Sequence, residues 1–234
     1  VSDTSAETVT LTVSEKTGTL LSGSATCTFY TIDGVKLAFN TTDEVLIGTV
    51  IQANATPIDA AGNIVKVPRL TVYFSSSNTT VATVSPYSTT TNADGLASVI
   101  VNALNPGTTY INATIMGKKA SKLLTVELPS LNLELNVTKI IVGIETPVLA
   151  TVTYAHNGTP VAEATVNATG CGVNVSGITD ENGNVTLLMN ATSVGTITVN
   201  ATKAGTNMAQ KVIEVVLPAN INIVDFVTVP AEIV

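Results

Sequence analysis

The chain has 234 residues, of which 45% are hydrophobic and only 12% are charged, and its net charge is −7. Soluble domains usually carry about 25% charged residues, so we expect neutral Thr, Ser and Asn to cover most of this surface. The negative charge, with ten scattered cations, argues against a nucleic-acid partner. No apolar run approaches the ~18 residues of a spanning helix, so we expect no membrane span.

The N-terminal residues 1–24 contain a clean alternation. Between Thr8 and Val13, apolar residues alternate with threonines, which is typical of a strand with one apolar face. The strand precedes Gly18 and Gly23, where the chain can hinge. A lone strand of this kind has to be paired. It can fold back on its own domain, or it can add to the sheet of a neighbouring subunit.

An internal repeat organises the middle of the chain. A shift of 88 residues places Thr91–Gly95 on Thr179–Gly183 and Ile111–Thr114 on Val199–Thr202. Asp-Gly and Asn-Gly turns between alternating runs predict hairpins, and no helical stripe appears. The predicted fold class is therefore all-β, with two tandem immunoglobulin-like β-sandwich domains and spare terminal strands. We place the first sandwich at 25–129, with 25–40 leading into it, and the second at 130–218.

The C-terminal residues 219–234 look like the start of a further repeat. The segment after Pro218 is too apolar to be a solvated tail. We therefore predict a second spare strand, whose apolar side chains are those of Ile221, Ile223 and Phe226.

Asn-x-Ser/Thr triplets are more frequent than composition explains. With 20 Asn and 54 Ser plus Thr residues, chance gives about four or five such triplets. The chain has eleven, which predicts an extracellular, cell-surface protein coated with N-glycans. In the predicted strands the acceptors alternate with apolar residues and fall on the solvent face. The acceptors are Asn40, Asn54, Asn78, Asn112, Asn136, Asn157, Asn167, Asn174, Asn184, Asn190 and Asn200.

The two cysteines, Cys27 and Cys171, are 144 residues apart. This spacing is too long for the disulfide within one immunoglobulin-type domain, and the chain has no Trp to pack on such a bridge. In an oxidising compartment they can form a disulfide within one chain or between neighbours. The alternative is two buried free thiols.

Catalytic chemistry is not indicated. His156 is the only histidine and lies in a predicted turn, so it supplies no catalytic set. The run from Asp180 to Asn184 resembles half of a calcium loop, but it lacks the later Glu and is ordinary turn chemistry. We therefore predict no enzyme, no catalytic or metal site, and no cofactor other than covalent N-glycans.

The repeat resembles the immunoglobulin-like surface repeats of bacteria and archaea, found in invasin- and intimin-type adhesins and in surface-layer proteins. The resemblance lies in four pieces, Asp59–Asn63, Thr91–Ala97, Asn157–Val161 and Thr179–Val185, which together with the Gly-Thr-x-x-x-Asn-Ala-Thr strands cover most of 41–218. Such sandwiches serve as spacers, adhesins and fibre units alike, so the resemblance implies fold more strongly than function.

With the acceptor triplets and the spare strands, the chain is similar in kind to archaeal threads. These are glycosylated filaments whose subunits join by donor-strand complementation. The resemblance implies a head-to-tail homopolymer that contacts surfaces or neighbouring cells. It names Val9, Leu11 and Val13 as the side chains of the donated strand, with Ile221, Ile223 and Phe226 as the rival interface. The alternative function is a surface-layer or adhesin binding module that does not polymerise.

Overall fold

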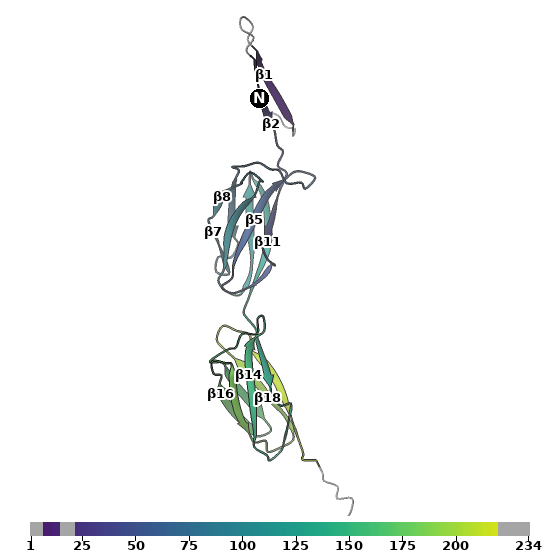
Figure 1. Cartoon of the computed structure of the whole chain (residues 1–234), viewed down its shortest axis with the longest axis vertical. Coiled ribbons are helices and arrows are strands. Elements are labelled where there is room, and N and C mark those ends of the chain that lie inside the picture. The colour runs from purple at the N-terminus through teal and green to yellow at the C-terminus, as the bar shows by residue number, and fades with distance from the viewer. Residues whose placement is uncertain (1–6, 15–21, 220–234) are drawn as a thin grey trace, which may run out of the picture. The chain divides into compact units, whose positions relative to one another are not determined.

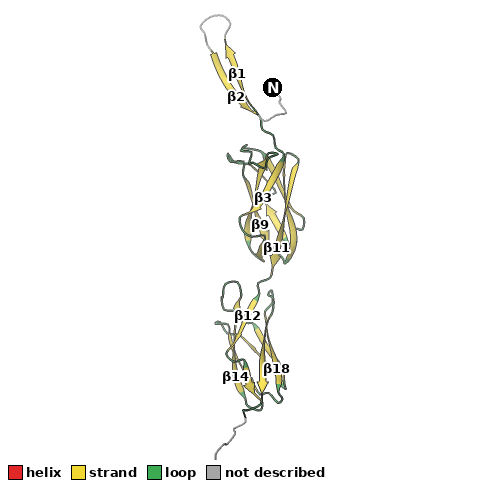
Figure 2. Cartoon of the chain, turned by 90° about the vertical axis from the view of Figure 1, so that its right-hand side faces the viewer, coloured by secondary structure: helices red, strands yellow, loops and turns green. Residues whose placement is uncertain are grey.

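The computed structural model describes residues 7–14 and 22–219, and every regular element in them is a strand (Figure 2). The chain divides between Leu128 and Pro129 into two compact units, which we call unit 1 and unit 2. Unit 1 begins with a hairpin of β1 (Thr8–Ser14) and β2 (Ser22–Thr28), whose strands run side by side in Figure 1. Residue 25, the predicted start of the first sandwich, therefore lies inside β2.

Two sheets build the sandwich of unit 1. Their strand orders are β3-β5-β9-β7 and β4-β11-β10-β6-β8. The bounds are β3 Gly34–Phe39, β4 Glu44–Leu46, β5 Val50–Ile58, β6 Thr71–Ser76, β7 Ala82–Ser85, β8 Ser88–Thr90, β9 Ala97–Ala103, β10 Gly107–Ile115 and β11 Lys118–Glu127.

Unit 2 repeats this plan with one difference. Its sheets have the orders β12-β14-β17 and β13-β19-β18-β15-β16, so its smaller sheet has three strands where that of unit 1 has four. The bounds are β12 Leu131–Leu135, β13 Lys139–Ile141, β14 Thr146–Tyr154, β15 Thr165–Gly170, β16 Val173–Ile178, β17 Asn184–Met189, β18 Gly195–Thr202 and β19 Ala209–Val216.

Strict alternation along the strands builds one core in each unit. In β18, Ile197, Val199 and Ala201 are fully buried, whereas Asn200 is half-buried and Thr202 is exposed. In β5, alternate residues are likewise buried. Since successive strand residues face opposite sides of a sheet, this pattern turns one face of each sheet inward and leaves Thr and Asn outside. The facing predicted from the sequence is confirmed, as is the all-β class of two tandem immunoglobulin-like β-sandwiches.

The first strand of each sandwich crosses from one sheet to the other. In unit 1, β3 pairs antiparallel with β5, and β4 then pairs parallel with β11, the last strand of the unit. In unit 2, β12 pairs with β14, and β13 pairs parallel with β19. Because first and last strands run parallel, the chain enters each sandwich at one end and leaves it at the other. We call these the incoming and outgoing ends.

A buried threonine fixes the same turn in both units. Thr91 and Thr179, which are 88 residues apart as in the sequence repeat, are 3% and 4% exposed. The Thr91 hydroxyl donates to the carbonyl of Val67 at 2.6 Å and accepts from the backbone N–H of Leu70 at 2.9 Å. Buried polar groups need such partners, so each threonine stabilises the loop that crosses its sandwich.

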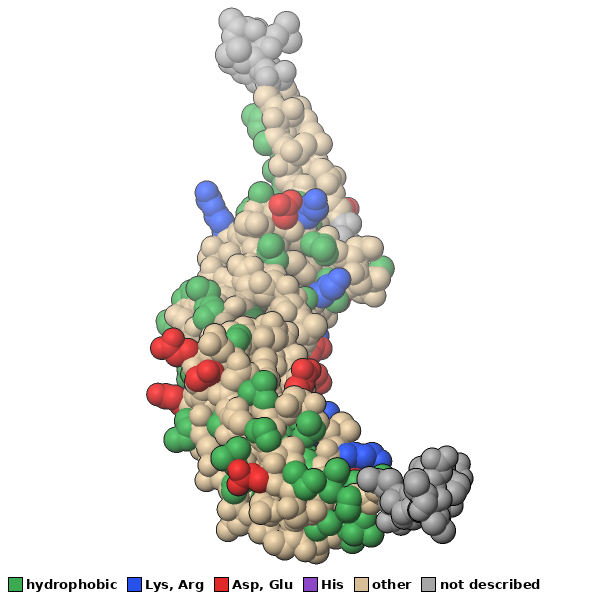
Figure 3. All heavy atoms as spheres, turned by 60° about the horizontal axis from the view of Figure 1, so that its bottom comes forward, with side chains coloured by type: hydrophobic (Ala, Val, Ile, Leu, Met, Phe, Trp, Pro, Cys, Tyr) green, Lys and Arg blue, Asp and Glu red, His purple; other side chains and the backbone are tan. Residues whose placement is uncertain are grey.

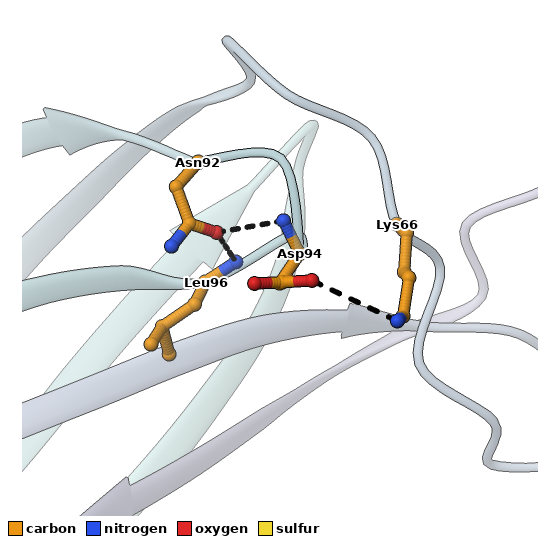
Figure 4. Close-up of polar contacts among 4 residues, drawn as sticks. All are labelled: Lys66, Asn92, Asp94 and Leu96. Carbon is orange, nitrogen blue, oxygen red and sulfur yellow. Dashed lines mark hydrogen bonds and ion pairs between the residues drawn. The ribbon is translucent and has the colours of Figure 1, made fainter.

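The turn after Thr91 is held by its own side chains (Figure 4). The Asn92 Oδ1 accepts from the backbone N–H groups of Asp94 and Leu96, both at 2.9 Å. Asp94 also lies 3.7 Å from the Nζ of Lys66. In unit 2, Asp180 plays the part of Asn92, because its Oδ1 accepts from two backbone N–H groups of its own turn. This is the turn chemistry that the Asn-Gly and Asp-Gly spacing predicts.

Candidate assembly and glycosylation surfaces

The N-terminal hairpin is amphipathic. In its register Val9 lies opposite Cys27, Leu11 opposite Ala25, and Val13 opposite Gly23. Directly opposite residues of an antiparallel pair share a face, so all these apolar positions lie together. The other face carries hydroxyl side chains, namely Thr8, Thr10, Thr12, Ser24, Thr26 and Thr28.

The apolar face of the hairpin has little cover. Leu11 is 46% exposed and Val13 is 74% exposed, while Val9 is half-buried. A shallow hollow beside the hairpin is lined by Leu11, Val13, Gly23, Ser24 and Ala25, and Figure 3 shows hydrophobic side chains along one side of the hairpin. The sequence left the partner of this strand open, and in the described residues β1 pairs with β2 of the same chain. The rival strand with Ile221, Ile223 and Phe226 lies outside the described residues.

An open sheet edge distinguishes unit 2 from unit 1. In unit 1, β7 pairs with β9, so that Ser85 lies opposite Ile100 and Thr83 opposite Asn102. A shift of 88 residues carries Ile100 and Asn102 onto Leu188 and Asn190. Within the described residues, however, β17 pairs with β14 alone. Among the described residues, no strand of unit 2 pairs with the edge that β7 covers in unit 1.

A tight turn stands where the missing strand would begin. In unit 1, the N–H of Leu104 donates to the carbonyl of Val81, just before β7, at 2.8 Å. In unit 2, the N–H of Thr192 donates to the carbonyl of Cys171 at 2.8 Å. Cys171 lies in the turn from β15 to β16, and the chain then continues along β15 as β16. The bond to the loop after β17 is thus kept, but in the described part of the chain no strand follows it along that edge.

All eleven acceptor asparagines are accessible to some degree. Seven are exposed, and the four others, Asn54, Asn112, Asn184 and Asn200, are half-buried in strands. Unit 1 carries four acceptors and unit 2 carries seven, and on unit 2 three triplets lie side by side. Asn167 is directly opposite Asn200 on one neighbouring strand and opposite Ser176, of the Asn174 triplet, on the other.

Two of the asparagines expected to carry glycans also have a structural role, which the sequence did not reveal. Asn40 and Asn136 lie where the first strand leaves one sheet for the other. The Oδ1 of Asn40 accepts from the N–H of Gln52 at 2.8 Å, and the Oδ1 of Asn136 accepts from the N–H of Leu149 at 2.8 Å. Each side chain thereby extends the ladder by one bond. The Nδ2 atom, which would carry a glycan, takes no part in these bonds.

Both cysteines are free in this structure. Cys27 is exposed on the apolar face of the hairpin, and Cys171 is half-buried, with its Sγ 3.4 Å from the carbonyl oxygen of Thr196. The described chain thus contains no disulfide between them, and pairing between neighbouring copies stays a prediction. Cys171 lies at the outgoing end of unit 2, where β15 ends and β18 begins.

His156 and Asp180, the other two polar residues considered in the sequence, both lie in turns. His156 is exposed in a turn, with its ring centroid 5.6 Å from that of Tyr154. The Asp180 carboxylate accepts hydrogen bonds from the N–H groups of Asn182 and Asn184. The part of the chain that the structure describes holds no group of three or more His, Cys, Asp or Glu side chains placed for a metal ion. Nor do these residues include a helix long and apolar enough to cross a membrane.

No protein-family model matches the chain, and no curated protein matches it. Among solved structures it is similar to the Yersinia pseudotuberculosis adhesin InvE, with 16% identity and a TM-score of 0.34, over 77% of this chain and 58% of that one. It is also similar to the Escherichia coli adhesin FdeC, with 23% identity and a TM-score of 0.40, over 82% of this chain and 68% of that one. Domains 5–6 of the surface-layer protein SbsC share 20% identity with it at a TM-score of 0.31, over 79% of this chain and 98% of that one. At these identities the likeness concerns the fold alone.

Proposed function

We propose that this chain is the structural subunit of a glycosylated extracellular filament, which polymerises head-to-tail by donation of its N-terminal strand. The observation that carries the proposal is the uncovered apolar face of the hairpin, built by Val9, Leu11 and Val13. An amphipathic two-stranded hairpin is marginal by itself in water, and Leu11 and Val13 are largely exposed. A partner sheet would cover them, and a head-to-tail contact does not close on itself.

The energetics support a lasting joint. Full burial of a Val or Leu side chain contributes roughly 1.5–3 kcal/mol, and each ladder hydrogen bond adds about 1 kcal/mol net. Because β1 is already ordered in the hairpin, docking of three such side chains and a ladder along β1 would require little further ordering of the chain. The surface also suits an extracellular fibre, because only 12% of the residues are charged and their side chains are scattered over the face in Figure 3. N-glycans on the accessible acceptors would keep such a surface from associating nonspecifically.

The test compares two double variants of the full chain from its native host. Leu11→Asp with Val13→Asp places charge on the apolar face, and we expect it to abolish filaments in negative-stain images. Thr10→Asp with Thr12→Asp adds the same charge to the opposite face of the same strand and should leave filaments intact. If wild-type protein forms only separate particles, the filament proposal fails, and a non-polymerising surface-layer or adhesin module becomes the better account.

A further inference from the structure

We propose that the open edge of β17 in unit 2 is the acceptor for β1 of a second copy of this chain. The inference rests on the proposed function, because it names the surface that receives the donated strand. The whole hairpin would dock through the free edge of β1, so its own pairing with β2 would remain. Its apolar face would turn toward the interior of the acceptor sandwich.

The peptide groups of β17 are oriented to receive a strand. The N–H of Val152 donates to the carbonyl of Gly183 at 2.8 Å, which sets the alternation of the ladder between β14 and β17. Val185, Leu187 and Met189 therefore direct their peptide groups toward β14. Those of Thr186 and Leu188 point the other way, toward the open edge. An uncovered edge of this kind is a template for pairing with another chain.

Unit 1 shows that this fold accepts a strand at this place. β7 adds antiparallel to the equivalent edge of β9, and its Ala82 is fully buried there. In unit 2, the side chains beside the open edge are less covered than the core, since Val175 of β16 and Val185 of β17 are only partly buried. Apolar side chains from a docked β1 would close over them, as Ala82 closes over its sheet in unit 1.

The number of strands also fits. The smaller sheet of unit 2 has three strands and faces a sheet of five. A docked hairpin would extend the smaller sheet to five and place β2 at its new edge. A donated single strand would give the four strands that the smaller sheet of unit 1 already has.

The antiparallel direction seen for β7 places the two cysteines at the same end of the joint. β17 ends beside Cys171, because the N–H of Thr192 binds the Cys171 carbonyl. An antiparallel β1 would begin at that end, and Cys27 lies opposite Val9, near the start of β1. Cys27 of one copy would therefore approach Cys171 of the next.

The first test uses proline at the open edge. Leu188→Pro removes an N–H that points away from β14, so the sandwich itself should tolerate it, whereas Leu188→Ala keeps the N–H. Leu188 is 57% exposed and lies outside every acceptor triplet. We expect Leu188→Pro to abolish filaments and Leu188→Ala to keep them, with the folding of both variants checked by circular dichroism. Filaments from Leu188→Pro would overturn the acceptor assignment.

A mixing experiment tests the acceptor assignment even if Leu188→Pro disturbs β17. Leu188→Pro subunits should donate but not accept, and subunits with Leu11→Asp and Val13→Asp should accept but not donate. Each alone should remain a monomer, and an equimolar mixture should give dimers and nothing longer, as measured by light scattering. A mixture of two folded variants that stays monomeric would overturn the assignment.

The outcomes separate the two proposals. Wild-type filaments that survive Leu188→Pro, but not the change of Leu11 and Val13, would leave strand donation standing and move the acceptor elsewhere. Loss of filaments on truncation after Ala219 would make the C-terminal segment the occupant and overturn the role of β1.

In wild-type filaments a short bismaleimide should join Cys27 to Cys171 of the next copy. Its ladder on a denaturing gel should vanish with Cys27→Ser; failure to link would overturn the antiparallel joint.

Discussion

Units 1 and 2 share their turns and the crossing of their first strand, but they differ at one sheet edge. In unit 1 the chain leaves β6, forms β7 along β9 and only then forms β8 along β6. In unit 2 a tight turn at Cys171 sends the chain back along β15 as β16. The difference shows that a repeat can keep its core and turns while the connection between two strands decides whether an edge is closed.

The two units differ in the connection that follows β6 in unit 1 and β15 in unit 2. Thr91 and Thr179 have the same partners in kind, and Asn40 and Asn136 cap the same crossing. The segments that differ, around β7 and around Cys171, have hydrogen bonds of their own, among them the bond from the Thr80 N–H to the Asn78 Oδ1 in unit 1 and that from the Cys171 Sγ to the Thr196 carbonyl in unit 2. Four substitutions test which contacts stabilise each unit.

The largest effect should come from the buried threonines. In Thr179→Val the carbonyl of Val161 and the N–H of Ala164 both lose a hydrogen-bond partner in a buried site, at about 1–3 kcal/mol each. Thr91→Val should cost a similar amount in unit 1. Denaturant unfolding of both variants would measure this, and Thr179→Ser, which keeps the hydroxyl, is the control. Equal stability of the Val and Ser variants would contradict the role of the hydroxyl.

A smaller effect should follow Gly177→Ala in β16. A Cβ at this position would lie 2.5 Å from the Cγ2 of Val185 and 3.1 Å from the Cδ2 of Leu187. The β-branched Val185 has little freedom to move away, so we expect unit 2 to lose about 1–3 kcal/mol. Gly23→Ala, with nothing within 4 Å, should leave the unfolding midpoint unchanged. A Gly177→Ala variant that melts like the wild type would show that β16 and β17 are not tightly apposed.

Variants at the capping asparagines can separate the stability that the side-chain amide contributes from the effect of losing the glycan. Asn136→Ala removes the bond to the N–H of Leu149 and also the acceptor, whereas Thr138→Ala removes the acceptor and keeps the amide. We expect Asn136→Ala to be less stable than Thr138→Ala by about 1 kcal/mol, with both lacking the same glycan by mass spectrometry. Asn40→Ala and Thr42→Ala repeat the test in unit 1. Indistinguishable stabilities of the paired variants would argue against the cap.

The smallest expected effect is a loss of stability of unit 1 at acid pH, through Asp59. The side-chain amide of Asn63 donates to the Asp59 carboxylate at 3.1 Å, and it is the main cause that holds the pKa of Asp59 below its ordinary value of 3.8; backbone N–H donors add to it. A carboxyl group with a lowered folded pKa adds stability above its unfolded pKa and loses it as pH falls through the folded pKa. Wild-type unit 1 should therefore lose slightly more stability than Asp59→Asn between about pH 5 and pH 2. Parallel acid-limb melting curves would contradict this.

Much of the fold could be predicted from the sequence because its strands alternate strictly. The inward positions of β18 and the turn after Thr91 follow from period and turn residues alone. The pairing of β1 could not be predicted, because alternation marks a strand but does not name its partner. Cys27 lies on β2, whose first half, Ser22–Ser24, contains a glycine and no apolar side chain and so does not look like a strand. The only local signal for the pairing is the spacing of Ala25 and Cys27, which lie two residues apart, as Val9 and Leu11 do on the partner strand.

The open edge at β17 lay beyond sequence reasoning for a different reason. The repeat aligns well at Thr179 and at Val199, but the stretch between β15 and β17 has no gapless match to unit 1. Whether a segment there forms a β7 or lengthens β16 depends on the turn at Cys171, where a non-glycine residue takes a φ of 51° between two glycines. Cys171 attracts attention in the sequence as a disulfide candidate, and its backbone role shows only in three dimensions.

The parallel pairing of first and last strands also governs how each unit bears tension. β4 and β11 lie side by side in unit 1, as β13 and β19 do in unit 2, and the chain leaves each pair at opposite ends. A pull on the two termini therefore acts along the strands and loads the hydrogen bonds of each pair together in shear. Bonds loaded in this way must break at once and cannot open one by one like a zipper. Each unit is thus built to stay folded when the chain is stretched lengthwise.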